Sequence, residues 1–211
     1  MSPPPSDRLF IPPRLGETTI SDFISRQNRR AFSNIYKNRG GSVQVGRHIA
    51  INVGAACKDN GKDWALGGVG IYFGPLSRYN FSDNLSESNG RRQTSQRIEV
   101  NAATIALRKV KDLLDEKKLN TGLVLILSKS RYLVEGITQN IYKWLDNGWE
   151  NSKGGEVSNK EDFEELDELV NELEDDYKVF VKFWWIPKEE NEPADEMARQ
   201  EAGIWDSDDS D

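Results

Sequence analysis

Histidine and cysteine, the two side chains used most widely in catalysis and metal binding, each occur once in this chain. The single histidine, His48, disfavours a histidine-based metal site or a catalytic triad, because such sites need an imidazole together with further partners. The single cysteine, Cys57, excludes a disulfide within the chain and fits a reducing compartment. The 211 residues carry a formal net charge of −7, which argues against a generic nucleic-acid coat protein.

The apolar pattern also limits where the protein can work. No apolar run approaches the roughly 20 residues that a membrane-spanning helix needs. The N-terminal residues have neither the basic start nor the apolar stretch of a secretory signal. We therefore expect an intracellular protein without membrane association, either nuclear or cytoplasmic.

Charge is distributed unevenly along the chain. Residues 1–47 hold eight Lys or Arg against three acids, so the remainder is strongly acidic. We interpret residues 1–46 as a basic, proline-containing arm, with a short amphipathic helix from Ser21 to about Tyr36 and a boundary at the Gly40-Gly41 pair. A basic arm on an acidic body indicates either a partner with an anionic surface or an arm that folds back on its own body.

Residues 47–204 are expected to form one α/β domain, followed by an acidic, disordered tail at 205–211. Three strands joined by short turns predict an antiparallel start, and two further strands alternate with helices. The result is a five-stranded mixed sheet flanked by helices, in which the last two strands run parallel to the first. The expected strands are 49–55, 64–73, 78–81, 123–128 and 178–186, and the expected helices are 93–118, 130–145, 160–173 and 194–201.

In open α/β sheets, functional groups gather beyond the carboxyl ends of the central strands. Four parts of this chain meet there: the first strand, the first helix of the body where it crosses the sheet, the end of strand 123–128, and the start of the last helix. The side chains at these four places are therefore the test of any function.

Short stretches at these places resemble ribonuclease H domains of the eukaryotic type-1 kind, over roughly residues 47–203. Each stretch alone is weak, but their order and spacing together match well. The resemblance implies an RNase H-like fold and hydrolysis of the RNA strand of RNA/DNA hybrids by two divalent ions that four carboxylates hold. The stretches are Ala56–Gly61, Gln93–Glu99, Ser128–Val134, Ile137–Thr138 through Asn147–Trp149, Ser152–Gly154, Asn159–Phe163 and Pro193–Arg199.

The chain departs from this family at two of the four acidic positions. Glu99 and Asp195 match, whereas the other two acids fall on Gly54 and Lys129. Glu99, Asp195 and Lys129 together carry −1, so two divalent ions would leave an excess charge of +3 in a partly dehydrated cleft. We therefore predict a pseudoenzyme without a metal cofactor, or with at most one weak Mg²⁺ on Glu99 and Asp195 if residual activity remains.

Lys129 indicates how such a site could be stabilised without metal. Its ammonium could lie between Glu99 and Asp195 and pair with one or both carboxylates. The alternative is an exposed lysine without a partner. If the rest of the cleft is intact, aspartates at both Gly54 and Lys129 should restore some cleavage.

The resemblance also implies nucleic-acid contacts. Asn60 falls where the family contacts the RNA strand, and Arg97 could reach a phosphate. Two of the candidate contact residues also have a purely structural interpretation: Thr94 could simply cap its helix, and Trp149 could be a core residue. The remaining candidates are Ser95 and Gln96 at the start of the first helix, and Ser152 and Asn159, which together with Trp149 match the positions that cradle the DNA strand.

Three functions remain open. The first is a catalytically inactive protein that binds RNA/DNA hybrid or duplex RNA, or that belongs to a nucleic-acid-associated complex. The second is a protein-interaction scaffold that presents its N-terminal arm or its acidic helix 160–174 to a partner. The third is a residual hybrid ribonuclease that uses Glu99 and Asp195.

Overall fold

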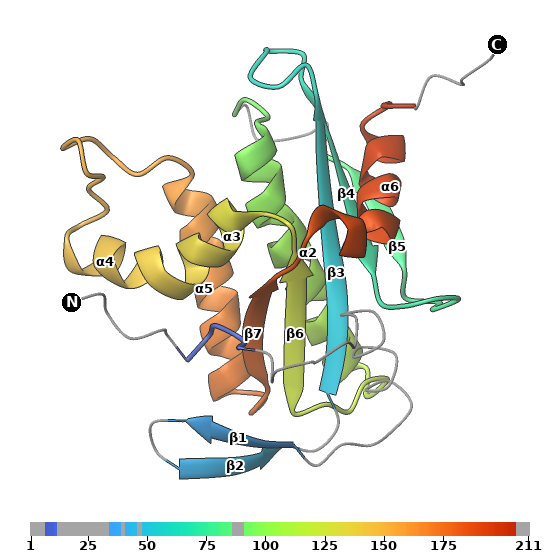
Figure 1. Ribbon diagram of the computed structural model, residues 1–211, viewed down its shortest axis with the longest axis vertical. Helices are drawn as coiled ribbons and strands as arrows, with labels where there is room; N and C mark the ends of the chain where they lie inside the picture. Colours follow the sequence, from blue (N-terminus) through green and yellow to red (C-terminus); the bar gives the residue numbers. More distant parts are fainter. Residues whose placement is uncertain (1–6, 12–33, 39–40, 46–47, 86–90, 206–211) are drawn as a thin grey trace.

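Five strands form one mixed sheet in the order β5-β4-β3-β6-β7 (Figure 1). Strand β3 (His48–Lys58) pairs antiparallel with β4 (Leu66–Tyr72), which pairs antiparallel with β5 (Phe81–Asn84). Strands β6 (Leu123–Ser128) and β7 (Phe180–Trp185) continue the sheet parallel to β3. The expected topology is confirmed. The computed structural model describes residues 7–11, 34–38, 41–45, 48–85 and 91–205.

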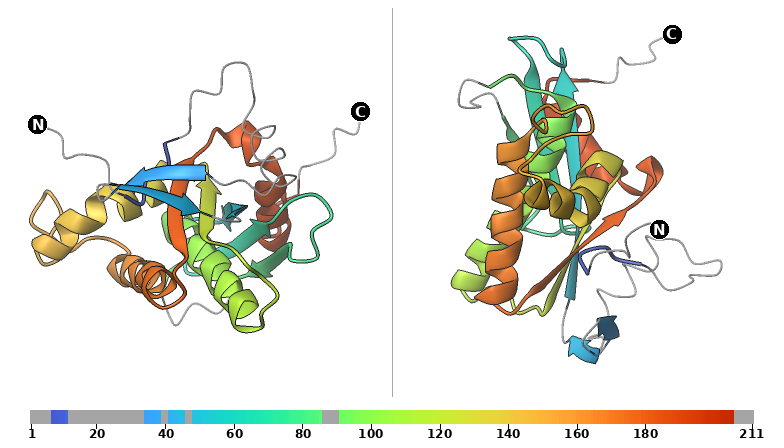
Figure 2. Two further views of the ribbon diagram at one scale, coloured as in Figure 1. Left: turned by 90° about the horizontal axis from the view of Figure 1, so that it is seen from below. Right: turned by 90° about the vertical axis from the view of Figure 1, so that its left-hand side faces the viewer.

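The helices cover both faces of this sheet. Figure 2 shows α2 (Ser95–Asp115) and α5 (Lys160–Asp175) on one face and α6 (Glu192–Glu201) on the other. Among the described residues, no helix combines the length and the apolar character needed to span a membrane. The connection between β6 and α5 contains α3 (Arg131–Glu135), a π-helical turn at Gly136–Asn140 and α4 (Ile141–Asp146). The connection between β7 and α6 contains a 3₁₀ turn at Lys188–Glu190.

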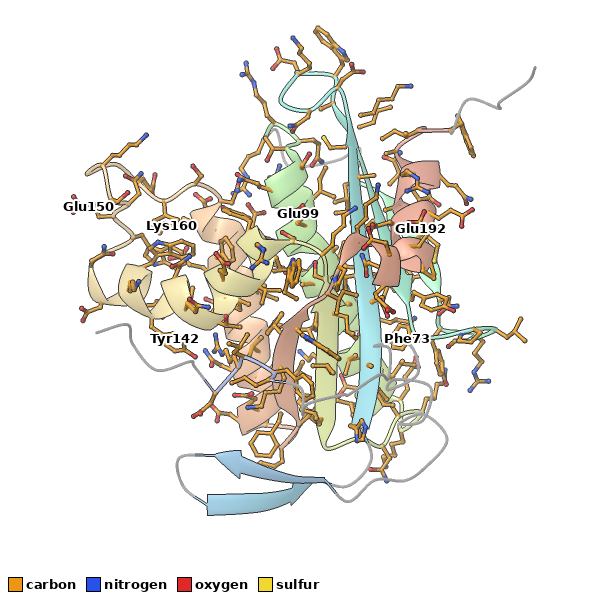
Figure 3. All side chains as sticks on the ribbon, viewed as in Figure 1. Phe73, Glu99, Tyr142, Glu150, Lys160 and Glu192 are labelled. Atoms are coloured by element: carbon orange, nitrogen blue, oxygen red, sulfur yellow. The ribbon has the colours of Figure 1, made fainter. Side chains whose placement is uncertain are left out.

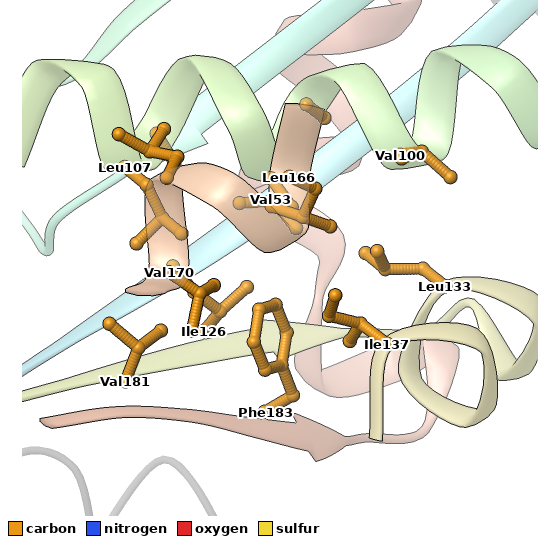
Figure 4. Close-up of a cluster of buried hydrophobic side chains, with 14 of the residues drawn as sticks. Val53, Val100, Leu107, Ile126, Leu133, Ile137, Leu166, Val170, Val181 and Phe183 are labelled. Atoms are coloured by element: carbon orange, nitrogen blue, oxygen red, sulfur yellow. The ribbon is translucent and has the colours of Figure 1, made fainter. Parts of the chain in front are cut away.

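The main core fills the face beneath α2 and α5 (Figure 4). Alternate residues of the strands, such as Ile126 of β6 and Phe183 of the edge strand β7, point into it and are fully buried. Leu107 of α2 and Leu166 of α5 meet them from above, because apolar residues at helical spacing form one stripe on each helix. Large apolar side chains therefore lie between these two helices and the sheet.

The face beneath α6 is built differently, because glycines line it. A Cβ added at Gly68 would lie 2.1 Å from the Ala198 carbonyl oxygen, and one added at Gly70 would lie 2.2 Å from that of Ala194. Gly54 of β3, the register partner of Gly70, is equally crowded. The backbone of α6 thus rests directly on strands β3 and β4.

Part of the N-terminal arm lies along the outer edge of β7. Leu9 forms a parallel bridge with Phe183, and Phe10 packs on Trp184 with 5.2 Å between the ring centroids. Phe10, Trp184 and neighbouring apolar residues of β6 form a second, smaller cluster, on the opposite side of the sheet from the main core. For residues 7–11, the interpretation that the arm folds back on its own body is confirmed.

Two expected boundaries need correction. Residues 34–36 are not helical but belong to β1 (Asn34–Asn38), which pairs antiparallel with β2 (Gly41–Val45), so Gly41 lies in a hairpin and not at a break. Residues 21–33 of the expected helix, and residues 206–211 of the expected tail, lie outside the described residues. The third strand of the sheet starts at Phe81, because the Asn80 side chain closes the preceding turn through Phe73 N and Gly74 O.

Candidate functional site

Three charged side chains meet where β6 ends and α6 begins. Lys129, directly after β6, places its Nζ 2.6 Å from Oδ2 of Asp195 in the first turn of α6. The lysine side chain is 30% exposed and the carboxylate 1%, so the cation separates the buried acid from solvent. Glu99, the third of these side chains, comes from α2. Figure 3 labels Glu99, and it labels Glu192 at the start of α6, which marks the other side of the site. The expected pairing of Lys129 is confirmed for Asp195.

Glu99 makes a separate contact. The Ser130 hydroxyl donates to its Oε2 at 2.6 Å, and the same hydroxyl accepts the Leu133 amide as the N-cap of α3. Burial raises the pKa of Glu99, while the Ser130 bond and the charge of Lys129 oppose this rise. Burial likewise raises the pKa of Asp195, against the opposing hydrogen bond and charge of Lys129. Lys129 therefore acts on both carboxyls, but it bonds to only one of them.

A buried asparagine pair, which the sequence analysis missed, holds Asp195 in place. Asn191 Nδ2 lies 3.0 Å from both Asp195 Oδ1 and the Val53 carbonyl, and its Oδ1 accepts from Asn52 Nδ2 at 3.1 Å. Asn52 also donates to the Glu190 carbonyl at 3.1 Å. The signal that could have found the pair is an asparagine just before a helix with a proline in its first turn, a common helix start.

The position of Gly54 is closed to a longer side chain. Its Cβ, if added, would lie 2.1 Å from the Ala194 carbonyl oxygen and 2.7 Å from the Asp195 amide nitrogen. Backbone atoms of α6 therefore fill the space that an aspartate at this position would need. The expectation that aspartates at Gly54 and Lys129 restore cleavage assumed an open cleft, and in this structure α6 would have to move first.

The candidates at the start of α2 mainly serve that helix. Thr94 Oγ accepts the Arg97 amide at 3.2 Å, and Asn60 Oδ1 accepts the Ser95 amide at 3.0 Å, so the capping interpretation of Thr94 is confirmed. Gln96 is exposed. The expectation that Arg97 reaches a phosphate does not hold in this structure, because its guanidinium is buried 3.3 Å from the Asp162 carboxylate of α5.

The second group of candidates lies between α4 and α5. Trp149 is buried and stacks on Trp144 with 5.6 Å between ring centroids, so here it is a core residue and does not offer a flat face. Ser152 is exposed in the loop that follows. Asn159, in a left-handed backbone conformation, donates to the Tyr132 hydroxyl at 3.0 Å.

Comparison with known proteins agrees with this arrangement. A family model described as RNase H matches residues 47–203. Mouse Ribonuclease H1 is 33% identical over 162 residues, which are 75% of this chain and 51% of the mouse protein. The chain thus spans about half the length of the mammalian relatives that it matches.

Solved structures share the fold at lower identity. LC9-RNase H1, a type 1 RNase H with the type 2 active-site motif, gives a TM-score of 0.54 at 22% identity and covers 74% of this chain and 72% of its own. The foamy viral protease-reverse transcriptase in complex with an RNA/DNA hybrid gives 0.53 at 17% identity, over 73% of this chain and 20% of its own. The sheet order, the helices on both faces and the extent of the family match lead to one conclusion: the chain belongs to the RNase H family.

Proposed function

We propose that this domain is a catalytically inactive RNase H that binds an RNA/DNA hybrid or a duplex RNA without cleaving it. The observation that carries the proposal is the ion pair of Lys129 and Asp195, at 2.6 Å, in the place where the family resemblance requires carboxylates around metal ions. An ammonium neutralises Asp195 directly, so this acid does not need a metal cation to balance its charge.

The donor set does not fit two magnesium ions. Mg²⁺ prefers about six oxygen ligands with near-ideal octahedral geometry, whereas Glu99 and Asp195 supply the only matching carboxylates and both are already engaged. Gly54 contributes no ligand, and α6 backbone occupies the space beside it. Within the described part of the chain, no group of three or more His, Cys, Asp or Glu side chains is arranged to hold a metal. We therefore assign the site no metal-dependent step.

Nucleic-acid binding is supported by the surface that the fold retains. Gln96 and Ser152 are exposed polar residues at positions that, by the family resemblance, face the two strands of a hybrid. The foamy viral protein of the same fold was solved with an RNA/DNA hybrid. Because the chain carries a net charge of −7, we expect modest affinity with a clear dependence on salt.

The test measures cleavage and binding on the same purified chain. We expect no Mg²⁺-dependent hydrolysis of a labelled hybrid above that of the Glu99→Gln variant. Binding should be measurable by fluorescence anisotropy, should be unchanged by EDTA, and should weaken as salt rises. Gln96→Ala and Ser152→Ala should each weaken it about fivefold, since each removes one polar contact. Gln200→Ala, an exposed glutamine on α6, is the matched control.

Two results would contradict the proposal. Hydrolysis by the unmodified chain that disappears in Glu99→Gln would establish a residual ribonuclease. Absence of binding even at low salt would instead favour the second candidate, a protein-interaction scaffold. One observation already favours that candidate: Arg97 and Trp149, two of the expected nucleic-acid contacts, point inward and help to hold the domain together.

A further inference from the structure

The N-terminal segment Asp7–Ile11 pairs with the edge of β7 as a short parallel strand would. The Phe183 amide donates to the Arg8 carbonyl at 2.8 Å, and the Phe10 amide donates to the Phe183 carbonyl at 2.9 Å. The Lys182 amine also donates to the Asp7 carbonyl. The two hydrogen bonds between main-chain groups of the segment and Phe183 fix the register of the segment, whatever its side chains are.

Two side chains of the segment make specific contacts with the body of the domain. The Arg8 guanidinium lies 2.6 Å from Asp167 Oδ1 and 2.8 Å from Asn171 Oδ1 on α5, and the arginine and aspartate side chains are only 8% and 14% exposed. It also lies 5.7 Å from the ring centroid of Tyr142 on α4. Phe10, 5% exposed, packs against Trp184 on the other side of the sheet.

We propose that the outer edge of β7, together with Asp167 of α5 on one side of the sheet and Trp184 on the other, is a peptide-docking site, and that Asp7–Ile11 is its displaceable resident. Its ligand is an extended peptide with an arginine two residues before a phenylalanine. Strand addition supplies affinity through the backbone, and the contacts with Asp167 and Trp184 supply selectivity. Arginine and aromatic residues are also the side chains that most often dominate binding energy at interfaces. The proposal does not depend on nucleic-acid binding.

The short reach of the pairing makes displacement feasible. Farther along the same edge, the Val181 amide is not available to an external strand, because it already donates to Glu174 Oε1 at 3.0 Å. At the other end of the segment, Ile11 is 67% exposed. The resident is held by two main-chain hydrogen bonds, by the Lys182 amine, by the contacts of Arg8 and Phe10, and by its tether, which provides an effective concentration on the order of millimolar. A competing peptide must approach that concentration unless the resident is weakened.

The test uses the full chain with Arg8→Ala and Phe10→Ala, which removes the two anchoring side chains of the resident, and a fluorescent peptide with the sequence of residues 6–12. We expect the double variant to bind this peptide at least tenfold more tightly than the unmodified chain, in which the resident competes. Changing the arginine and phenylalanine of the peptide to alanine should abolish binding. Adding Asp167→Asn to the double variant should weaken binding about tenfold, since the arginine loses its charged partner.

Hydrogen exchange at the Phe183 amide reports on the same site independently of affinity. This amide should be protected in the unmodified chain, exchange faster in the double variant, and regain protection when the peptide is added. If the double variant remains folded by circular dichroism but the peptide neither binds nor protects Phe183, the proposal is wrong. Equal binding of both peptides would also overturn it. If the double variant unfolds, Arg8→Glu with Asp167→Arg, which reverses the pair, should restore Phe183 protection that each single change removes.

Discussion

The two faces of the sheet are packed by opposite means. On one face, α2 and α5 are held away from the strands by large side chains such as Leu166 and Phe183. On the other, α6 lies on Gly54, Gly68 and Gly70, with backbone contacting backbone. The first face can lose atoms and leave a cavity, whereas the second has no space to receive any. Gly54 and Asp195, two of the candidate site residues, lie on the second face, so the chemistry of the site is limited by packing as well as by charge.

The largest effect should come from adding a side chain to the crowded face. We expect Gly54→Asp to lower the free energy of unfolding by at least about 4 kcal/mol, because its Cβ overlaps α6 and its carboxylate joins the buried Asp195. Leu166→Ala, a deletion on the opposite face, should cost about 3 kcal/mol. Urea denaturation measures both. Gly54→Ala separates overlap from charge, and a Gly54→Asp protein as stable as the unmodified chain would contradict the comparison.

A smaller loss should follow from removing the cation of the site. Lys129→Met keeps most of the side-chain volume but leaves Asp195 without its charged partner. We expect a loss of about 2 kcal/mol, less than for a fully buried pair because Lys129 is partly exposed. Lys129→Met combined with Asp195→Asn should recover most of this loss, since no unpaired charge remains. If Lys129→Met alone leaves stability unchanged, the ion pair does not organise this face.

The smallest effect should follow from a change at Glu99, and it should be a gain in stability where the other two changes cause a loss. Folding raises the pKa of Glu99 above its ordinary value of 4.5. Between the two values the folded state binds more protons than the unfolded chain, so the free energy of unfolding falls as the pH rises through this window. We expect Glu99→Gln to raise the melting temperature by a few degrees at pH 7, with no gain near pH 4. Melting curves across this range, with Glu196→Gln on exposed α6 surface as control, test the sign.

Much of the fold is predictable from the sequence because few topologies satisfy its pattern. The apolar run 123–128 indicates a strand covered on both faces, and strands that alternate with helices restrict the order of the sheet. The contact between Lys129 and Asp195 is predictable for a similar reason. Lys129 directly follows β6 and Asp195 lies in the first turn of α6, and the end of β6 and the start of α6 meet at the same place beside the sheet; their charges are opposite.

Other parts of the site depend on distances that a sequence does not contain. An arginine at position 97 suggests a phosphate contact. In the structure, Arg97 and Asn101, one turn along α2, both contact the Asp162 carboxylate, because α5 packs beside this part of α2. A glycine at position 54 indicates a flexible backbone or another segment packed closely against the strand, but the sequence does not identify α6 as that segment. The hairpin at β1 and β2 was missed because the apolar spacing of residues 23–35 also fits a helix.

The contacts at the edge of β7 have a consequence for solubility. An open strand edge with free amides and carbonyls is a template on which other chains can stack. Here the outward amide of Val181 bonds to a glutamate, and both groups of Phe183 bond to the N-terminal segment. A protein that lacks residues 1–10 would present a free donor and a free acceptor at Phe183, beside the apolar Trp184. Such a truncation should therefore aggregate from its folded state, at temperatures well below its melting point.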